Sequence, residues 1–201
     1  MLATRAMYAA VFMLLISGNA GLAHDASHSP AQALPAGEFG GPFQLIDHNG
    51  RAVTHESYWG KVAIYYFGYT SCPDICPTDA VNIAHALDLL GGQDAEVQPL
   101  FVTIDPERDT PTRLREWLGA IDSRFVGLTG GRQAVETVAA AFKVVYERIE
   151  ASAGYEYMFG HPGLIYVMDR DGSFVFLLPT GTPPEVIADE LRGALTGAQG
   201  N

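Results

Sequence analysis

The chain has 201 residues, of which 48% are hydrophobic and 17% charged, a composition typical of a globular protein rather than a disordered one. This length suits one domain with a single buried core and a short tail. The formal net charge of -11, with no basic patch to neutralise phosphates, excludes nucleic acid as a partner.

Residues 1–23 have the features of a secretory signal peptide. Arg5 precedes the apolar run AAVFMLLISG, and Gly21 and Ala23 are the small residues that a signal peptidase recognises, so cleavage is expected after Ala23. The alternative is an uncleaved anchor in the inner membrane, although the run falls short of the roughly 20 residues that span a bilayer. In both cases the folded part is expected outside the cytoplasm, in the periplasm or an equivalent compartment.

A polar, proline-containing segment follows this leader. Residues 24–37, HDASHSPAQALPAG, have the composition of a flexible tether. No internal repeat or second domain boundary follows, so a single domain is expected over residues 38–197. It opens with PFQLIDHNGRAVT, whose pattern around Asn49-Gly50 predicts a β-hairpin.

Strands and helices alternate through the rest of the domain. Residues 61–69, KVAIYYFGY, form a continuous apolar run that predicts a central strand buried on both faces. The later pattern predicts a helix from Pro77, a strand at 97–105 and a helix capped by Thr110. A short strand at 124–130 and a helix around 135–142 follow. The domain ends with a hairpin turning at Asp171-Gly172 and a last helix with a capping box of Thr182 and Glu185.

This order of elements predicts an α/β fold. Strands that alternate with helices favour a central, mainly parallel sheet flanked by helices on both faces, here preceded by the N-terminal hairpin. A cysteine motif that leaves a central strand and enters a helix narrows the prediction to a thioredoxin-like fold.

Both cysteines lie in TSCPDICPT, residues 70–78, with three residues between them. A disulfide between Cys72 and Cys76 would close a very small loop and add little stability, which favours a chemical role. A helix N-terminus stabilises the thiolate, the form that attacks disulfides and binds soft metals. Spacing alone leaves metal binding and thiol–disulfide exchange equally open.

His161 is the best-placed third ligand among the six histidines. It immediately precedes a buried strand in FGHPGLIYVMD, and this loop packs beside the cysteine loop in a thioredoxin-like fold. Two sulfurs and one nitrogen are fewer than the four ligands of zinc and therefore favour copper. The alternative is a histidine that is only hydrogen-bonded at a strand entry. The remaining histidines are expected in the tether or on the surface: His24, His28, His48, His55 and His85.

Five segments, in order, carry a family resemblance: GGPFQLIDHNG, YFGYTSCPDICPT, FVTIDPERDTP, FVGLTG and HPGLIYVMDRDG. Over about residues 39–190 the chain resembles the Sco/SenC/PrrC family of copper-delivery proteins for cytochrome oxidase assembly. The resemblance implies that Cys72, Cys76 and His161 hold one copper ion, Cu(I) or Cu(II). It also implies delivery of that ion to the CuA centre of cytochrome c oxidase subunit II, by a chaperone rather than an enzyme.

Further expectations concern partners and assembly. We expect a periplasmic thiol reductant and another copper chaperone as partners. The chain is expected to be a monomer that meets the membrane only through an N-terminal anchor.

The chain departs from the family pattern beside His161. Gly160 stands where the family usually has an acidic residue, and Pro162 where it has Ser or Thr. A missing acid removes one anchor for the imidazole, and Glu156 is a candidate to replace it. Asp74, between the cysteines, is a second candidate close to the metal, where it either faces a partner or caps the helix.

The segment DPERDTP, residues 105–111, receives no role in the metal site. Asp105 and Arg108 are expected to form a local ion pair, and Asp109 and Thr110 fit the start of a helix.

Two other functions use the same cysteines. A thiol–disulfide oxidoreductase acting on an oxidase subunit or another exported protein would cycle Cys72 and Cys76 through a disulfide, and would give His161 no obligatory role. A thiol peroxidase of the peroxiredoxin type is disfavoured, because Tyr65 and Tyr69 occupy the positions of its proline and its threonine or serine.

Overall fold

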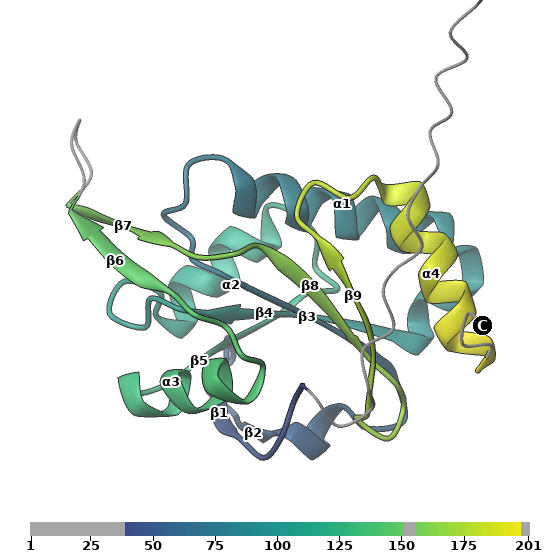
Figure 1. Cartoon of the computed structure of the whole chain (residues 1–201), viewed down its shortest axis with the longest axis horizontal. Helices are drawn as coiled ribbons and strands as arrows, with labels where there is room; N and C mark the ends of the chain where they lie inside the picture. Colours follow the sequence, from purple (N-terminus) through teal and green to yellow (C-terminus); the bar gives the residue numbers. More distant parts are fainter. Residues whose placement is uncertain (1–38, 151–155, 198–201) are drawn as a thin grey trace, which may run out of the picture. The chain divides into compact units, whose positions relative to one another are not determined.

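The computed structural model describes residues 39–150 and 156–197 (Figure 1). The expected signal peptide, 1–23, and tether, 24–37, lie outside these residues. Within the described ranges, no helix has the length and apolar character needed to cross a bilayer. The elements are β1 (Gln44–Asp47), β2 (Ala52–Thr54), η1 (His55–Tyr58), β3 (Val62–Gly68), α1 (Ile75–Leu89), η2 (Gly91–Glu96), β4 (Val97–Thr103), α2 (Pro111–Gly119), β5 (Val126–Thr129), α3 (Arg132–Ala141), β6 (Glu147–Glu150), β7 (Tyr157–Gly160), β8 (Leu164–Met168), β9 (Phe174–Pro179) and α4 (Pro184–Thr196).

One seven-stranded sheet has the order β2-β1-β5-β4-β3-β8-β9. The three central strands β3, β4 and β5 run parallel, whereas β1, β2, β8 and β9 pair antiparallel with their neighbours. The α/β, thioredoxin-like fold and the N-terminal hairpin are therefore confirmed, but the sheet is mixed rather than mainly parallel. Short hairpin turns after β1 and β8 enforce antiparallel pairing, since a parallel pair needs a long crossover.

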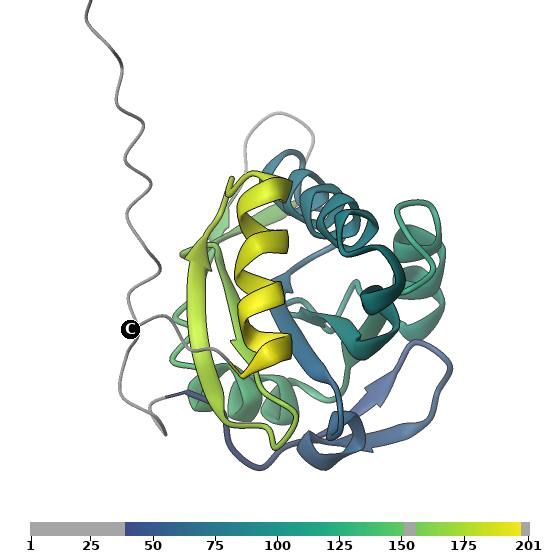
Figure 2. The same cartoon turned by 90° about the vertical axis from the view of Figure 1, so that its right-hand side faces the viewer.

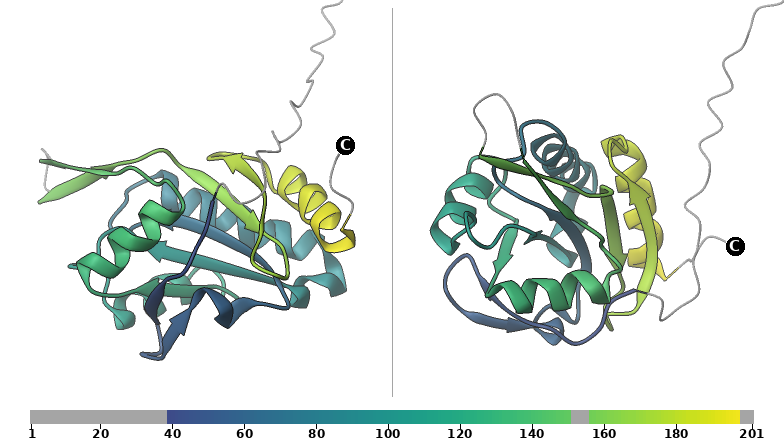
Figure 3. Two further views of the ribbon diagram at one scale, coloured as in Figure 1. Left: turned by 60° about the horizontal axis from the view of Figure 1, so that its bottom comes forward. Right: turned by 60° about the vertical axis from the view of Figure 1, so that its left-hand side comes forward.

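Alternate residues of β3 point to opposite faces of the sheet, and every residue of this strand is buried, as the apolar run predicts. The hydroxyl of Tyr66 donates to Asp79 of α1, whereas the ring of Tyr65 packs on Phe142, just after α3. Helices α1 and α4 lie side by side over one face (Figure 2). Helix α3 covers the other face (Figure 3).

Helix α1 begins at Ile75, two residues before the predicted start at Pro77. Proline is tolerated here because the N–H groups of a first helical turn have no intrahelical partner. The earlier start matters for the cysteines, since it places Cys76 inside the first turn with its side chain fully buried, while Cys72 stays in the preceding loop.

The start of α4 differs from the prediction. Its N-cap is Pro183, and no side chain caps the helix. The hydroxyl of Thr182 donates instead to the carbonyl of Pro179 at 2.6 Å, closing the turn after β9. The predicted capping box of Thr182 and Glu185 is therefore wrong, because a nearer carbonyl competes for the threonine hydroxyl.

The sequence did not indicate the two-stranded hairpin of β6 and β7, which forms its own small sheet (Figure 1). All four residues of β6, ERIE, are exposed. Such a strand lacks the apolar alternation by which strands are recognised. The hairpin is important because β7 ends at Gly160, immediately before His161.

Candidate metal centre

The two cysteines lie where β3 passes into α1. The thiol of Cys72 is half-buried, and its Sγ accepts a hydrogen bond from the Cys76 N–H at 3.4 Å. Cys76 is packed against the end of β3, where a Cβ added at Gly68 would lie only 3.0 Å from the Cys76 Sγ. Both thiols are free. A glycine at position 68 thus allows the helix to bring the second sulfur close to the strand.

The two thiols differ in acidity. Hydrogen bonds from the Cys76 thiol and from the N–H groups of residues 74–76 outweigh burial and lower the pKa of Cys72 to about 5. The hydrogen bond to Cys72 and burial both raise the pKa of Cys76. The first proton therefore leaves Cys72, and a thiolate is present there at neutral pH.

This difference predicts selective alkylation. Because its pKa is about 5, Cys72 should react with iodoacetamide throughout pH 6–8, and the rate should fall only as the pH drops toward 5. Cys76, which is fully buried, should stay unmodified in the folded protein. Peptide mapping after timed alkylation of the reduced chain measures both rates, and equal labelling of the two cysteines would contradict the assignment.

The start of the cysteine loop is fixed by a buried carboxylate. Asp109 is fully buried and accepts hydrogen bonds from the N–H of Thr70 at 3.0 Å and from its hydroxyl at 2.5 Å. It also accepts from the hydroxyl of Thr103 at the end of β4, at 2.7 Å. The segment after β4 therefore holds the residue from which the cysteine loop begins, a role beyond the predicted helix start.

His161 and Cys72 line the same pocket. The pocket has a volume of about 230 Å³, and its lining is formed by Tyr69, Cys72, Pro73, Asp74, Ile75, Met158, Phe159, Gly160 and His161. The imidazole ring is 6.4 Å from the ring of Tyr69, centroid to centroid. Its Nδ1 is 3.1 Å from the carbonyl oxygen of Pro162. A neutral imidazole that donates from Nδ1 to this carbonyl keeps Nε2 as its free ligand atom.

Burial lowers the pKa of His161, although the contact with the Pro162 carbonyl and the charge of Cys72 act in the opposite direction. The ring consequently loses its proton at a lower pH than an ordinary histidine. A metal ligand must be deprotonated, so both Cys72 and His161 are ready to coordinate at neutral pH.

Not all predicted site residues meet in this pocket. Cys76 does not line it, and no three His, Cys, Asp or Glu side chains within residues 39–150 and 156–197 are arranged to hold a metal ion as they stand. Asp74 lines the pocket and occupies the N-cap position of α1, but its exposed carboxylate makes no capping bond. Glu156 is exposed and does not line the pocket.

The structure adds residues that motif reasoning missed. Tyr69, Met158 and Phe159 line the pocket together with Cys72 and His161. Tyr69 carried a weak signal, since it follows a fully buried strand and precedes the cysteine loop. Met158 and Phe159 carried none, because the hairpin that presents them was not predicted.

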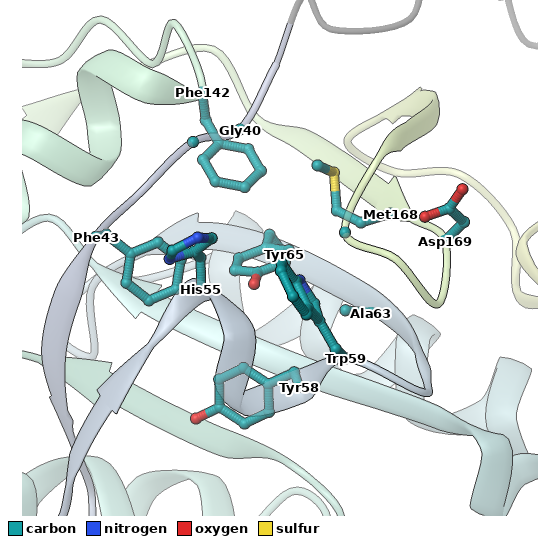
Figure 4. Close-up of a pocket in the computed structure, with 12 residues that line it drawn as sticks. Gly40, Phe43, His55, Tyr58, Trp59, Ala63, Tyr65, Phe142, Met168 and Asp169 are labelled. Atoms are coloured by element: carbon teal, nitrogen blue, oxygen red, sulfur yellow. The ribbon is translucent and has the colours of Figure 1, made fainter.

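A second cavity, of about 90 Å³, shares no lining residue with this pocket (Figure 4). Aromatic rings surround it, among them Phe43, Trp59 and Tyr65. His55 also lines it, and its buried Nδ1 has no hydrogen-bond partner among the residues that the structure describes. The expectation that His55 is a surface residue is thus corrected, because the η1 turn directs the ring inward.

The two other histidines that the structure describes differ in burial. His48 is also half-buried, contrary to expectation, and its Nδ1 accepts from the N–H of Gly127 at 2.9 Å. His85 is exposed on α1, as predicted.

Comparisons with known proteins agree with one another. The SCO1/SenC family model matches residues 31–196. A SCO2-like protein of Rickettsia felis is 36% identical over 157 residues, which are 78% of this chain and 77% of that protein. The structure of Bradyrhizobium japonicum ScoI with copper bound is 39% identical, with a TM-score of 0.72, covering 78% of this chain and 99% of that one. Arabidopsis thaliana ScoI with copper bound is 31% identical, with a TM-score of 0.75, covering 79% and 99%.

Proposed function

The chain belongs to the SCO1/SenC family, and we propose that it is a copper chaperone that holds one copper ion through the thiolates of Cys72 and Cys76 and the imidazole of His161. The observation that carries the proposal is the pocket lined by both Cys72 and His161, together with the hydrogen bond from the thiol of Cys76 to Cys72. Two of the similar structures have copper bound.

The donor set suits copper. Two thiolates favour soft ions such as Cu(I), and an imidazole is an accepted ligand for either oxidation state of copper. Because Cys76 does not line the pocket, loading requires a small shift that brings its sulfur and the imidazole onto one ion. The low pKa of Cys72 makes it the first thiolate to bind, and the proton of Cys76 is released as copper takes its place.

The target follows from the family. We propose that the ion passes to the CuA centre of cytochrome c oxidase subunit II by ligand exchange, outside the cytoplasm, with a thiol reductant and a second copper chaperone as further partners. Exchange needs an under-coordinated, accessible ion, and Cys72 and His161 are only half-buried, which supports such access.

Gly160, which stands where the family usually has an acidic residue, lies close to a side chain of the neighbouring strand. A Cβ at Gly160 would lie 2.9 Å from Cδ1 of Ile149 on the paired strand β6. An acidic residue at position 160 would therefore require the flexible, exposed end of the Ile149 side chain to shift. The imidazole must be held by other contacts, because Glu156 does not reach the pocket.

A Cu(I) titration of the reduced full-length chain against a competing chelator tests the site. His161→Ala should lower the affinity by at least about tenfold, since loss of a supporting residue alone typically costs 10–100-fold. His85→Ala removes an exposed histidine from α1 and should leave the affinity unchanged. Equal affinities for the His161→Ala and His85→Ala variants would remove His161 from the ligand set.

The acidity of Cys72 favours thiol–disulfide exchange as a second function. Its thiolate would attack a disulfide of a partner, giving a mixed disulfide and a partner thiolate. Attack by Cys76 would then release the second partner thiol and leave a Cys72–Cys76 disulfide, which a periplasmic dithiol reductant must reduce. Oxidase-assembly activity that survives His161→Ala unchanged would favour this function over copper delivery.

A further inference from the structure

The segment Asp105–Asp109, between β4 and α2, contains contacts that its predicted role as a helix start does not explain. The predicted ion pair exists, with Arg108 Nε bonded to the carboxylate of Asp105. The same guanidinium donates from Nη1 to the carbonyl oxygen of Tyr157 at 3.1 Å and lies 3.6 Å from the centre of its ring. Arg108 therefore joins this segment to the first residue of β7, which lies 49 positions away in the sequence.

Tyr157 closes the cluster. Its hydroxyl donates to Oδ1 of Asp105 at 2.9 Å, so one carboxylate binds both the guanidinium and the phenol. Asp105 is 1% exposed and Tyr157 4% exposed. Hydrogen bonds to a charged group are stronger than neutral ones, and they are stronger still when they are buried.

The hairpin cannot fix its own position. An isolated two-stranded hairpin is only marginally stable in water. The partner strand β6 is exposed at every residue, so it contributes little burial. The place of β7 must therefore come from contacts with the main domain.

A second attachment lies nearer the imidazole. The N–H of Phe159 donates to the hydroxyl of Tyr69 at 3.3 Å, and the ring of Tyr69 is 6.4 Å from that of His161. Strand β7 is thus held at Tyr157 and again at Phe159, and His161 follows directly after its last residue.

We propose that Asp105 and Arg108 are positioning residues for His161, acting through Tyr157 and strand β7. The inference rests on the proposed function in one respect, which is that His161 is a copper ligand. The same segment holds the cysteine loop through Asp109 and Thr70. The segment 105–109 thereby contacts both the cysteine loop and the strand that precedes His161. These contacts would position the imidazole in place of an acidic residue at position 160.

The test is a double-mutant cycle on Cu(I) affinity, measured on the reduced full-length chain. Arg108→Lys keeps the charge but loses the planar fork that reaches both the carboxylate and the carbonyl. It should weaken Cu(I) binding about tenfold in the wild-type background and less than about twofold in the His161→Ala background. Arg192→Lys is the matched control, because Arg192 forms an exposed ion pair with Asp189 on α4, outside this segment and the hairpin, and should have no effect in either background.

A readout without metal accompanies the cycle. In the metal-free protein, Arg108→Lys should accelerate amide hydrogen exchange at Phe159 by about tenfold or more, and leave exchange in the β3 and β4 core unchanged. Tyr157→Phe removes only the bond to Asp105 and should give a smaller change of the same kind. The Tyr157→Phe variant can be measured in the same two experiments if Arg108→Lys does not fold.

The outcomes separate the two proposals. An Arg108→Lys effect of equal size with and without His161 would overturn the positioning role, because the residue would then act through the general fold. Normal affinity of Arg108→Lys, together with weak binding by His161→Ala, would overturn it while leaving the copper site intact. Normal affinity of His161→Ala would instead overturn the proposed ligand set, and the positioning role with it.

Discussion

Replacing Cys72 or Cys76 with serine is expected to lower the Cu(I) affinity of the reduced chain by more than about 100-fold, beyond the 10–100-fold range for residues that only support a ligand. Each change removes one of two soft, charged donors and leaves a hard, neutral hydroxyl that Cu(I) binds poorly. Competition with a calibrated chelator measures both variants under conditions that keep the remaining thiol reduced.

The two variants should differ in their side effects. Cys76 is fully buried beside Gly68, so Cys76→Ser replaces a buried sulfur with a smaller and more polar hydroxyl and should also lower stability slightly. Cys72→Ser should leave stability nearly unchanged because the side chain is half-buried in the loop.

Ser71→Ala, next to Cys72, controls for a change in the same loop and should bind copper normally. Retention of wild-type affinity by either serine variant would show that the chain binds copper elsewhere.

Much of the fold could be predicted because local patterns specify it. The continuous apolar run of β3, the proline and threonine at the start of α2 and the Asp171-Gly172 turn each encode their element within a few residues. The cysteine loop was equally visible, since a motif at a strand-to-helix junction carries its own chemistry.

Contacts across long stretches of sequence could not be predicted in this way. Asp109 reaches Thr70 over 39 positions, and Arg108 reaches Tyr157 over 49. Neither pair follows from helical or strand periodicity, because the topology of the sheet brings them together. The hairpin that ends just before His161 was missed because its exposed strand β6 shows no apolar alternation.

Asp79 is a charged residue in a position of α1 where the sequence pattern predicts an apolar one. It lies on the apolar stripe of α1 between Cys76 and Ile83, where a charged residue is unexpected unless it is paired. The carboxylate is fully buried. It accepts hydrogen bonds from the hydroxyl of Tyr66 at 2.9 Å, from the hydroxyl of Thr180, and from the N–H of Gly181 at 2.8 Å.

Asp79→Ala should therefore reduce the free energy of unfolding by about 3 kcal/mol or more. Three donors lose a charged acceptor: the fully buried hydroxyl of Tyr66, and the partly buried groups of Thr180 and Gly181. Each group left unsatisfied costs about 1–3 kcal/mol, with the buried hydroxyl at the upper end. In a chain of this size the melting temperature should fall by roughly 6–12 °C. Urea denaturation followed by circular dichroism measures the change, with an unaltered slope expected if the native and unfolded states are otherwise the same.

Asp88→Ala is the matched control on the same helix. The Asp88 side chain is 64% exposed and pairs with Arg124, so its loss should cost less than about 1 kcal/mol. Equal destabilisation by the two alanine variants would show that the buried network contributes nothing beyond an ordinary surface pair. A large difference would show that α1 is fixed to the sheet and to the loop after β9 by one carboxylate in its first two turns. Because Cys76 lies in the same turns, that carboxylate would then also determine where the second sulfur is held.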